Sequence, residues 1–164
     1  MVPQLLIRDT RSGAYSRAFF DEIIERELER ARRHDVVLSV LSVVLENWAA
    51  FVREEPATSV DGVVKTIANT LFADLRTTDY LFRWEDDEFL ALLVEADLEA
   101  CKLMVARVVD TFRPWREGKG PVARPLKVRA AATTLTGNLV FAGVLQNARA
   151  AARDASGGYP TIRV

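Results

Sequence analysis

The segment that most constrains the fold of this chain is the apolar run VVLSVLSVVL at residues 36–45. It consists almost entirely of Val and Leu, and β-branched residues such as Val favour strands. The run is too short to cross a lipid bilayer. A nearly continuous apolar strand is typical of a position in a sheet that is covered on both faces. We therefore predict a central strand over residues 35–46 that is buried on both faces.

Helical and extended patterns alternate along the rest of the chain. Apolar residues recur at helical spacing in residues 16–33, and Ser16 suits the N-cap position. Residues 96–115 predict a third long helix, whose apolar residues are Leu98, Leu103, Met104, Val108 and Phe112. The other predicted elements are, in chain order, helices over 46–55 and 60–76, strands over 79–84 and 87–94, a strand over 126–135, a helix over 139–155 and a strand over 159–164.

This order predicts an α/β fold with a mixed, mostly antiparallel central sheet flanked by helices, as one domain over residues 1–164. The net charge is −1 and no block of basic residues stands out, which does not favour binding to nucleic acid. Cys101 is the single cysteine, so an internal disulfide and a multi-cysteine metal site are excluded. The N-terminus lacks the features of a signal peptide. We expect a cytoplasmic protein without membrane attachment.

The predicted hairpin carries the sequence RWEDDEFLALL at residues 83–93. Four carboxylates stand side by side, from Glu85 to Glu88, where a two-residue turn usually has Asn or Gly. The run can be a metal site, the remains of an active site or a solvated loop. Because burying several unpaired carboxylates is prohibitive, we expect Glu85 and Asp86 at an exposed hairpin tip and the acidic run in water.

The element order, with an acidic motif on a central hairpin, resembles the diguanylate cyclase (GGDEF) domain family. The family signature is Arg, an apolar or aromatic residue, Gly, Gly, Asp or Glu, Glu and Phe, and it is matched in part by Arg83-Trp84-Glu85-Asp86-Asp87-Glu88-Phe89. A family motif near DxLTGxxNRxxF is matched in part by DTRSGAYSRAFF at residues 9–20. The resemblance runs from Asp9 to about Gly158 and implies the palm-like fold of nucleotide cyclases.

The same resemblance implies that the chain is catalytically inactive. Glu85 and Asp86 replace the two glycines that let the backbone approach GTP, and their carboxylates would repel a triphosphate. The family's magnesium-binding aspartate falls at Val44, and two residues that hold the base and fix the site fall at Val52 and Arg53. Two-metal phosphoryl transfer needs converging carboxylates, of which Asp87 could supply one. We expect no diguanylate cyclase activity, no catalytic residue, no cofactor and no metal, with metal binding without catalysis as an alternative.

A second family motif is intact. Arg76-Thr77-Thr78-Asp79 matches the RxxD motif of the inhibitory site (I-site) for the product, cyclic di-GMP, at the family spacing from the signature. The additional arginine of that site falls at Arg107. Guanidinium groups can grip a phosphate or the edge of guanine, and an aspartate can accept from guanine N1–H and N2–H. The structural alternative is that Arg76 complements a helix dipole, Asp79 caps a turn and Arg107 pairs with Asp110.

We therefore expect a cyclic di-GMP receptor that acts through Arg76, Asp79 and Arg107. The alternative is a protein-interaction scaffold that binds no nucleotide, and an active diguanylate cyclase is the third reading. The receptor is expected to have a protein partner, and the resemblance implies that the ligand could link two copies of the chain.

Overall fold

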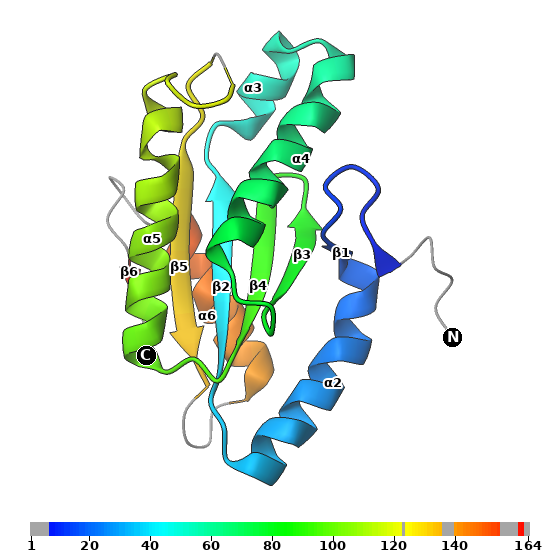
Figure 1. Ribbon diagram of the computed structural model, residues 1–164, viewed down its shortest axis with the longest axis vertical. Coiled ribbons are helices and arrows are strands. Elements are labelled where there is room, and N and C mark those ends of the chain that lie inside the picture. The colour runs from blue at the N-terminus through cyan, green and yellow to red at the C-terminus, as the bar shows by residue number, and fades with distance from the viewer. Residues whose placement is uncertain (1–6, 123, 136–139, 155–160, 163–164) are drawn as a thin grey trace.

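The computed structural model describes residues 7–122, 124–135, 140–154 and 161–162. Its centre is a six-stranded sheet in the order β1-β3-β4-β2-β5-β6 (Figure 1). The strands are β1 (Tyr15–Ser16), β2 (Leu38–Leu45), β3 (Tyr80–Glu85), β4 (Glu88–Val94), β5 (Val128–Thr134) and β6 (Thr161–Ile162). The four long strands pair antiparallel, while the short β1 and β6 add parallel edges. The predicted mixed, mostly antiparallel sheet is confirmed.

Strand β2 lies between β4 and β5, and all eight of its residues are buried. Its side chains alternate between two cores, with Leu41 and Val43 in one and Val40 in the other. The prediction of a central strand covered on both faces is confirmed. The strand starts later than residue 35 because Asp35 takes a left-handed conformation (φ 52°) and caps the preceding helix.

Helices cover both faces of the sheet, which gives three layers (Figure 1). One face packs against α2 (Arg17–His34) and α6 (Phe141–Asp154). The other face packs against α3 (Trp48–Glu54), α4 (Ala57–Asp74) and α5 (Leu98–Arg116). Helix α4 begins at Ala57, one turn before the predicted start, since its first turn can follow Pro56 directly. The predicted ends of the last helix, at 139 and 155, and most of the predicted last strand fall outside the described residues.

Leu103, one of the apolar residues of the helix predicted over 96–115, does not lie in the core. Its side chain is 68% exposed on α5, whereas its neighbour Met104 is buried against α4 and the sheet. The apolar residues of α5 span more of the helix circumference than the core can cover, so one of them faces solvent. Cys101, on the buried face of the same helix, is fully covered, as expected of a small apolar side chain.

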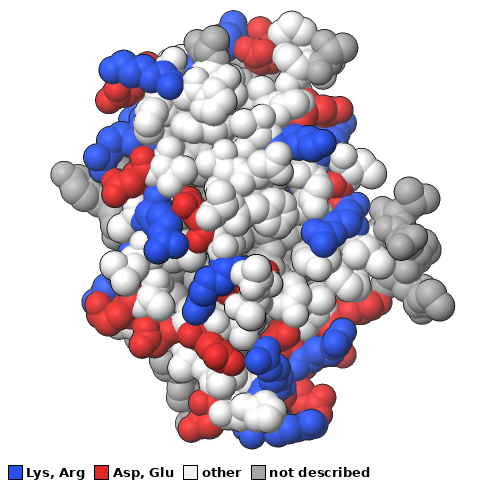
Figure 2. All heavy atoms as spheres, in the orientation of Figure 1, with Lys and Arg blue, Asp and Glu red and all other residues white. Residues whose placement is uncertain are grey.

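The face formed by α4 and α5 has an uncharged centre, with acidic and basic side chains mixed around it (Figure 2). No area of this view is dominated by basic residues. Among the helices of the described residues, none is long and apolar enough to span a membrane.

Candidate functional site

The RxxD motif forms the turn between α4 and β3. The Asp79 side chain is completely covered, and its two oxygens accept hydrogen bonds from the backbone N–H groups of Arg76 (3.0 Å) and Val94 (3.1 Å). These bonds fasten the turn to the end of β4. Asp79 therefore caps the turn, as the structural alternative to ligand binding predicts. By holding this turn it also positions Arg76.

The two arginines of the predicted site lie at one pocket. The guanidinium of Arg76 donates to the carbonyl of Val94 (2.9 Å) and lies 3.6 Å from Asp79 Oδ2. Arg107, on α5, donates to the carbonyl of Asp74 at the end of α4 (3.3 Å). It does not pair with Asp110, which instead binds Arg113. The two arginines thus line the same pocket, Arg76 from the turn after α4 and Arg107 from α5.

This arginine pocket has a volume of about 170 Å³ and an apolar floor. Its lining consists of Arg76, Leu93, Ala96, Ala100, Leu103, Met104 and Arg107. The exposed Leu103 contributes to its wall, which gives this residue a surface role that its sequence pattern did not indicate. Two guanidinium groups beside an apolar surface suit a flat anionic ligand, because the cations bind the negative charge and the floor takes the planar face.

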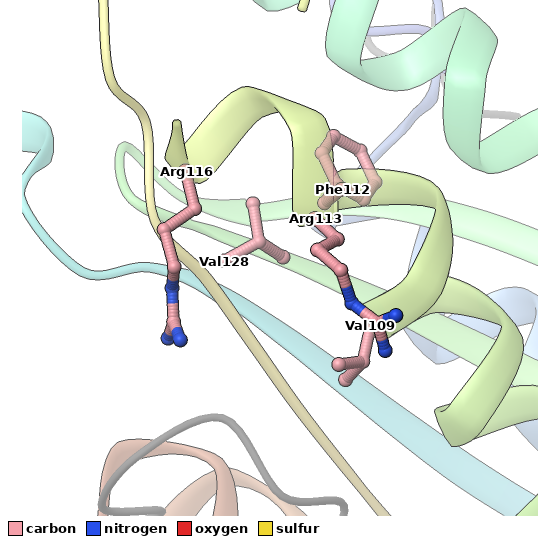
Figure 3. A pocket seen from close by; sticks show the side chains of 5 residues that line it. All are labelled: Val109, Phe112, Arg113, Arg116 and Val128. Carbon is pink, nitrogen blue, oxygen red and sulfur yellow. The ribbon is translucent and has the colours of Figure 1, made fainter. Parts of the chain in front are cut away.

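A second pocket with two arginines lies at the other end of α5 (Figure 3). It measures only about 70 Å³, and Arg113 and Arg116 lie on either side of Val128 in it. Arg113 is engaged by Asp110. This pocket contains no residue of the RxxD motif, and Arg113 is a useful reference for Arg107 because both are exposed arginines of α5.

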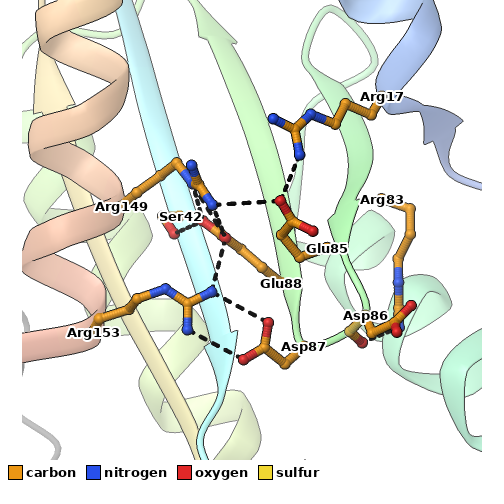
Figure 4. Close-up of polar contacts among 9 residues, drawn as sticks. All are labelled: Arg17, Ser42, Arg83, Glu85, Asp86, Asp87, Glu88, Arg149 and Arg153. Carbon is orange, nitrogen blue, oxygen red and sulfur yellow. Dashed lines mark hydrogen bonds and ion pairs between the residues drawn. The ribbon is translucent and has the colours of Figure 1, made fainter.

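The acidic hairpin differs from its prediction in one respect. Glu85 and Asp86 are exposed at the turn between β3 and β4, as expected, and Phe89 lies in the core. The expectation that the whole acidic run needs water is wrong for Glu88, whose side chain is 0% exposed, while Asp87 is half-buried. Strand β4 begins at Glu88, so its side chain points to the face of the sheet that α6 covers (Figure 4).

Two arginines of α6 make this burial possible. Arg149 donates to both oxygens of Glu88 (2.9 and 3.0 Å), Ser42 donates to the same carboxylate (2.9 Å), and Arg153 bridges Glu88 and Asp87 (both 3.2 Å). The pKa of each arginine is raised, first by its hydrogen bonds to these carboxylates. The buried carboxylate of Glu88 is thus hydrogen-bonded to two cationic side chains.

The exposed carboxylate of Glu85 joins the same network. It contacts Arg17 of α2, and Arg149 lies 3.8 Å away (Figure 4). Sequence reasoning missed Arg149, although it lies one helical turn before Arg153 and therefore on the same face of α6. The network fastens the acidic turn to helices on one side of the sheet.

A larger hollow lies on the opposite side of the acidic turn. This α3 pocket measures about 470 Å³ and is lined by Leu45, Glu46, Trp48, Ala49, Val52, Asp86 and Asp87. Val44, where the family resemblance places a metal-binding aspartate, is 4% exposed and pairs in register with Glu88. Within the described residues, no three side chains of His, Cys, Asp or Glu are grouped so that they could hold a metal ion.

The family model for the diguanylate cyclase GGDEF domain matches residues 6–155. Diguanylate cyclase DosC of Escherichia coli (strain K12) is 27% identical over 88 residues, which cover 54% of this chain and 19% of DosC. The chain therefore spans about a fifth of the length of that relative.

Two solved structures show the same fold. The GGDEF domain of DgcB from Caulobacter crescentus, in complex with c-di-GMP, superposes with a TM-score of 0.84 at 12% identity over 99% of this chain and 98% of that chain. Diguanylate cyclase SiaD in complex with its activator SiaC, from Pseudomonas aeruginosa, gives a TM-score of 0.82 at 24% identity over 96% of this chain and 62% of that chain. Because the family model covers most of its length and the fold agrees, the chain belongs to the diguanylate cyclase GGDEF domain family.

Proposed function

We propose that this chain is a catalytically inactive GGDEF domain that binds cyclic di-GMP in the arginine pocket. The observation that carries the proposal is that Arg76 and Arg107, selected by family spacing, line one pocket although they come from separate elements. The ligand has two phosphates and two guanines. The guanidinium groups can grip phosphate or the guanine edge, and the apolar floor can receive a base.

Asp79 contributes to this site through the turn that it holds. Its covered carboxylate fixes the backbone of Arg76 and so aims that side chain at the pocket. A direct contact with guanine requires the turn to open, because the side chain has no exposed surface. Substituting Asp79 therefore perturbs the fold as well as the ligand site, and the two exposed arginines are the better test positions.

The proposal of catalytic inactivity has separate support. Val44 provides no metal ligand, and the carboxylates of Asp87 and Glu88 are held by Arg149 and Arg153. Glu85→Gly and Asp86→Gly together should not restore cyclase activity with GTP and Mg²⁺ or Mn²⁺, because the side chain of Val44 is unchanged. Product formation by the wild-type chain above a control without protein would overturn this part of the proposal.

Calorimetric titration with cyclic di-GMP tests the receptor role. Loss of one charge-assisted contact costs about 1.5–3 kcal/mol, so Arg76→Ala and Arg107→Ala should each weaken binding roughly tenfold or more. Arg113→Ala is the matched control: it lies on the same helix as Arg107 and is exposed, but it does not line this pocket. Cyclic di-AMP should bind less tightly than cyclic di-GMP.

The outcome also separates the receptor from the scaffold alternative. No wild-type binding at high micromolar ligand, or equal binding by wild type and both pocket variants, would leave the scaffold as the better account. A protein partner and a ligand-linked homodimer belong to the receptor proposal, and light scattering with and without cyclic di-GMP would measure the dimer. Solved relatives of this fold are known with c-di-GMP and with a protein activator.

A further inference from the structure

The α3 pocket has no role in the proposed receptor function. It lies between α3, the end of β2 and the acidic turn, whereas the arginine pocket is formed by the turn after α4, by β4 with the loop that follows it, and by α5. Four of its lining residues are apolar: Leu45, Trp48, Ala49 and Val52. Its volume of about 470 Å³ falls within the range of about 300–1,000 Å³ that is typical of binding pockets. The surface is therefore large enough for a specific occupant.

The charges of the α3 pocket have one sign. Glu46, Asp86 and Asp87 line it, and no Lys or Arg does. Arg129 holds Glu46 (2.6 Å) and Arg153 holds Asp87 (3.2 Å). The carboxylate of Asp86 is different, since it makes no hydrogen bond or ion pair with any part of the chain that the structure describes. Arg83 donates to the backbone oxygen of Asp86 and its charge attracts the Asp86 carboxylate, but no direct contact joins the two charged groups and the carboxylate stays exposed.

These charges exclude some classes of occupant. Arginines already pair with Glu46 and Asp87, so Asp86 is the carboxylate that an occupant would meet, and its charge disfavours a phosphate group. A bare metal ion is not favoured either, because the described residues contain no grouping of three potential ligands. An apolar wall with an unpaired carboxylate at its rim instead suits an organic cation with an aliphatic stem, such as the side chain of Lys or Arg.

We propose that the α3 pocket binds a lysine or arginine side chain that a partner protein presents among apolar residues. The apolar stem and its neighbours pack on Trp48, Ala49 and Val52, and the cationic head pairs with Asp86. The pocket opens at the exposed residues Glu46, Ala49 and Asp86, so a side chain attached to a larger body can enter it. The replacement of two glycines by Glu85 and Asp86 then has a consequence beyond lost catalysis: it favours a cationic partner over a nucleotide.

Three short peptides test the charge requirement. They are acetyl-Gly-Leu-Arg-Leu-Gly-amide and the same peptide with citrulline, the neutral analogue of arginine, or with glutamate at the centre. Amide chemical shifts of the ¹⁵N-labelled chain locate each peptide and give its affinity. The arginine peptide should shift the amides of residues 45–52 and 86–87 and bind about fivefold tighter than the citrulline peptide, with glutamate weakest.

Three variants test the location. Ala49→Phe fills the pocket and should abolish binding of the arginine and citrulline peptides, whereas Ala50→Phe, on the next exposed residue outside the lining, should leave both unchanged. Asp86→Asn should remove the preference for arginine over citrulline. No shifts at millimolar peptide, shifts confined to other surfaces, or equal wild-type affinity for both peptides would overturn the proposal. Because cyclic di-GMP is absent from these titrations, the result is independent of the receptor proposal.

Discussion

The buried ion pair between Glu88 and Arg149 is the contact whose energetic role can be predicted most sharply. The Glu88 carboxylate has no exposed surface, and Arg149 supplies three of its hydrogen bonds while Ser42 and Arg153 supply one each. Removing one partner of a buried pair costs about 3–5 kcal/mol because a desolvated charge is left behind. Since Arg153 remains near Glu88, we expect Arg149→Leu to lie at the lower end, about 3 kcal/mol.

The double variant gives the decisive comparison. Glu88→Leu alone also destabilises the fold, because it leaves Arg149 without its main partner. Glu88→Leu with Arg149→Leu should cost less than either single change, since an apolar pair of similar volume can replace a buried ion pair at little cost. Urea unfolding of the four proteins measures this cycle.

The exposed pair of Glu29 and Arg33, one helical turn apart on α2, serves as the control. Breaking it should change the free energy of unfolding by about 0.5 kcal/mol or less. If the costs of the two buried substitutions simply add, or if Arg149→Leu costs less than about 1 kcal/mol, then the network does not stabilise the acidic turn as argued.

Further predictions concern backbone packing and alkaline stability. Gly120→Ala should destabilise the fold by about 1–3 kcal/mol, because a Cβ there would lie 2.7 Å from the ring of Trp115. Gly62→Ala, on the open surface of a helix, should instead stabilise the fold by about 0.5–1 kcal/mol. Urea unfolding measures both changes. Burial and the hydrogen bond to Glu27 raise the pKa of Tyr80 above its ordinary value near 10. The contribution of Tyr80 to the free energy of unfolding is therefore complete below about pH 10 and is lost as the pH rises through the higher pKa of the folded state. Between about pH 9 and 11, the stability of the wild type should fall more than that of Tyr80→Phe.

Local patterns predicted the layers of the fold well. The strand at 38–45 was predictable because a short apolar run rich in Val is typical of a strand covered on both faces. The exposure of Leu103 could not be predicted, because helical periodicity marks apolar residues but not the width of the surface that covers them. The start of β2 shifted because Asp35 adopts a left-handed cap, which periodicity does not report.

The candidate site was predicted unevenly for a physical reason. Family spacing identified Arg76 and Arg107, which line the same pocket, but the covered state of Asp79 depends on a hydrogen bond from Val94 at the end of β4. The burial of Glu88 likewise depends on Arg149, which is distant in the sequence and reaches it across β2. A run of four acidic residues is predicted to be solvated when the arginines that pair with it lie far away in the sequence.

The most direct test of the central claim is to locate cyclic di-GMP on the ¹⁵N-labelled chain by amide chemical shifts. Binding in the arginine pocket should shift amides of residues 74–79, 93–96 and 100–107, and leave residues 45–52 and 86–87 unchanged. Shifts centred on residues 45–52 and 86–87 would mean that the nucleotide uses the α3 pocket despite its carboxylates. That result, or no shift anywhere at high micromolar ligand, would contradict a receptor site at Arg76 and Arg107.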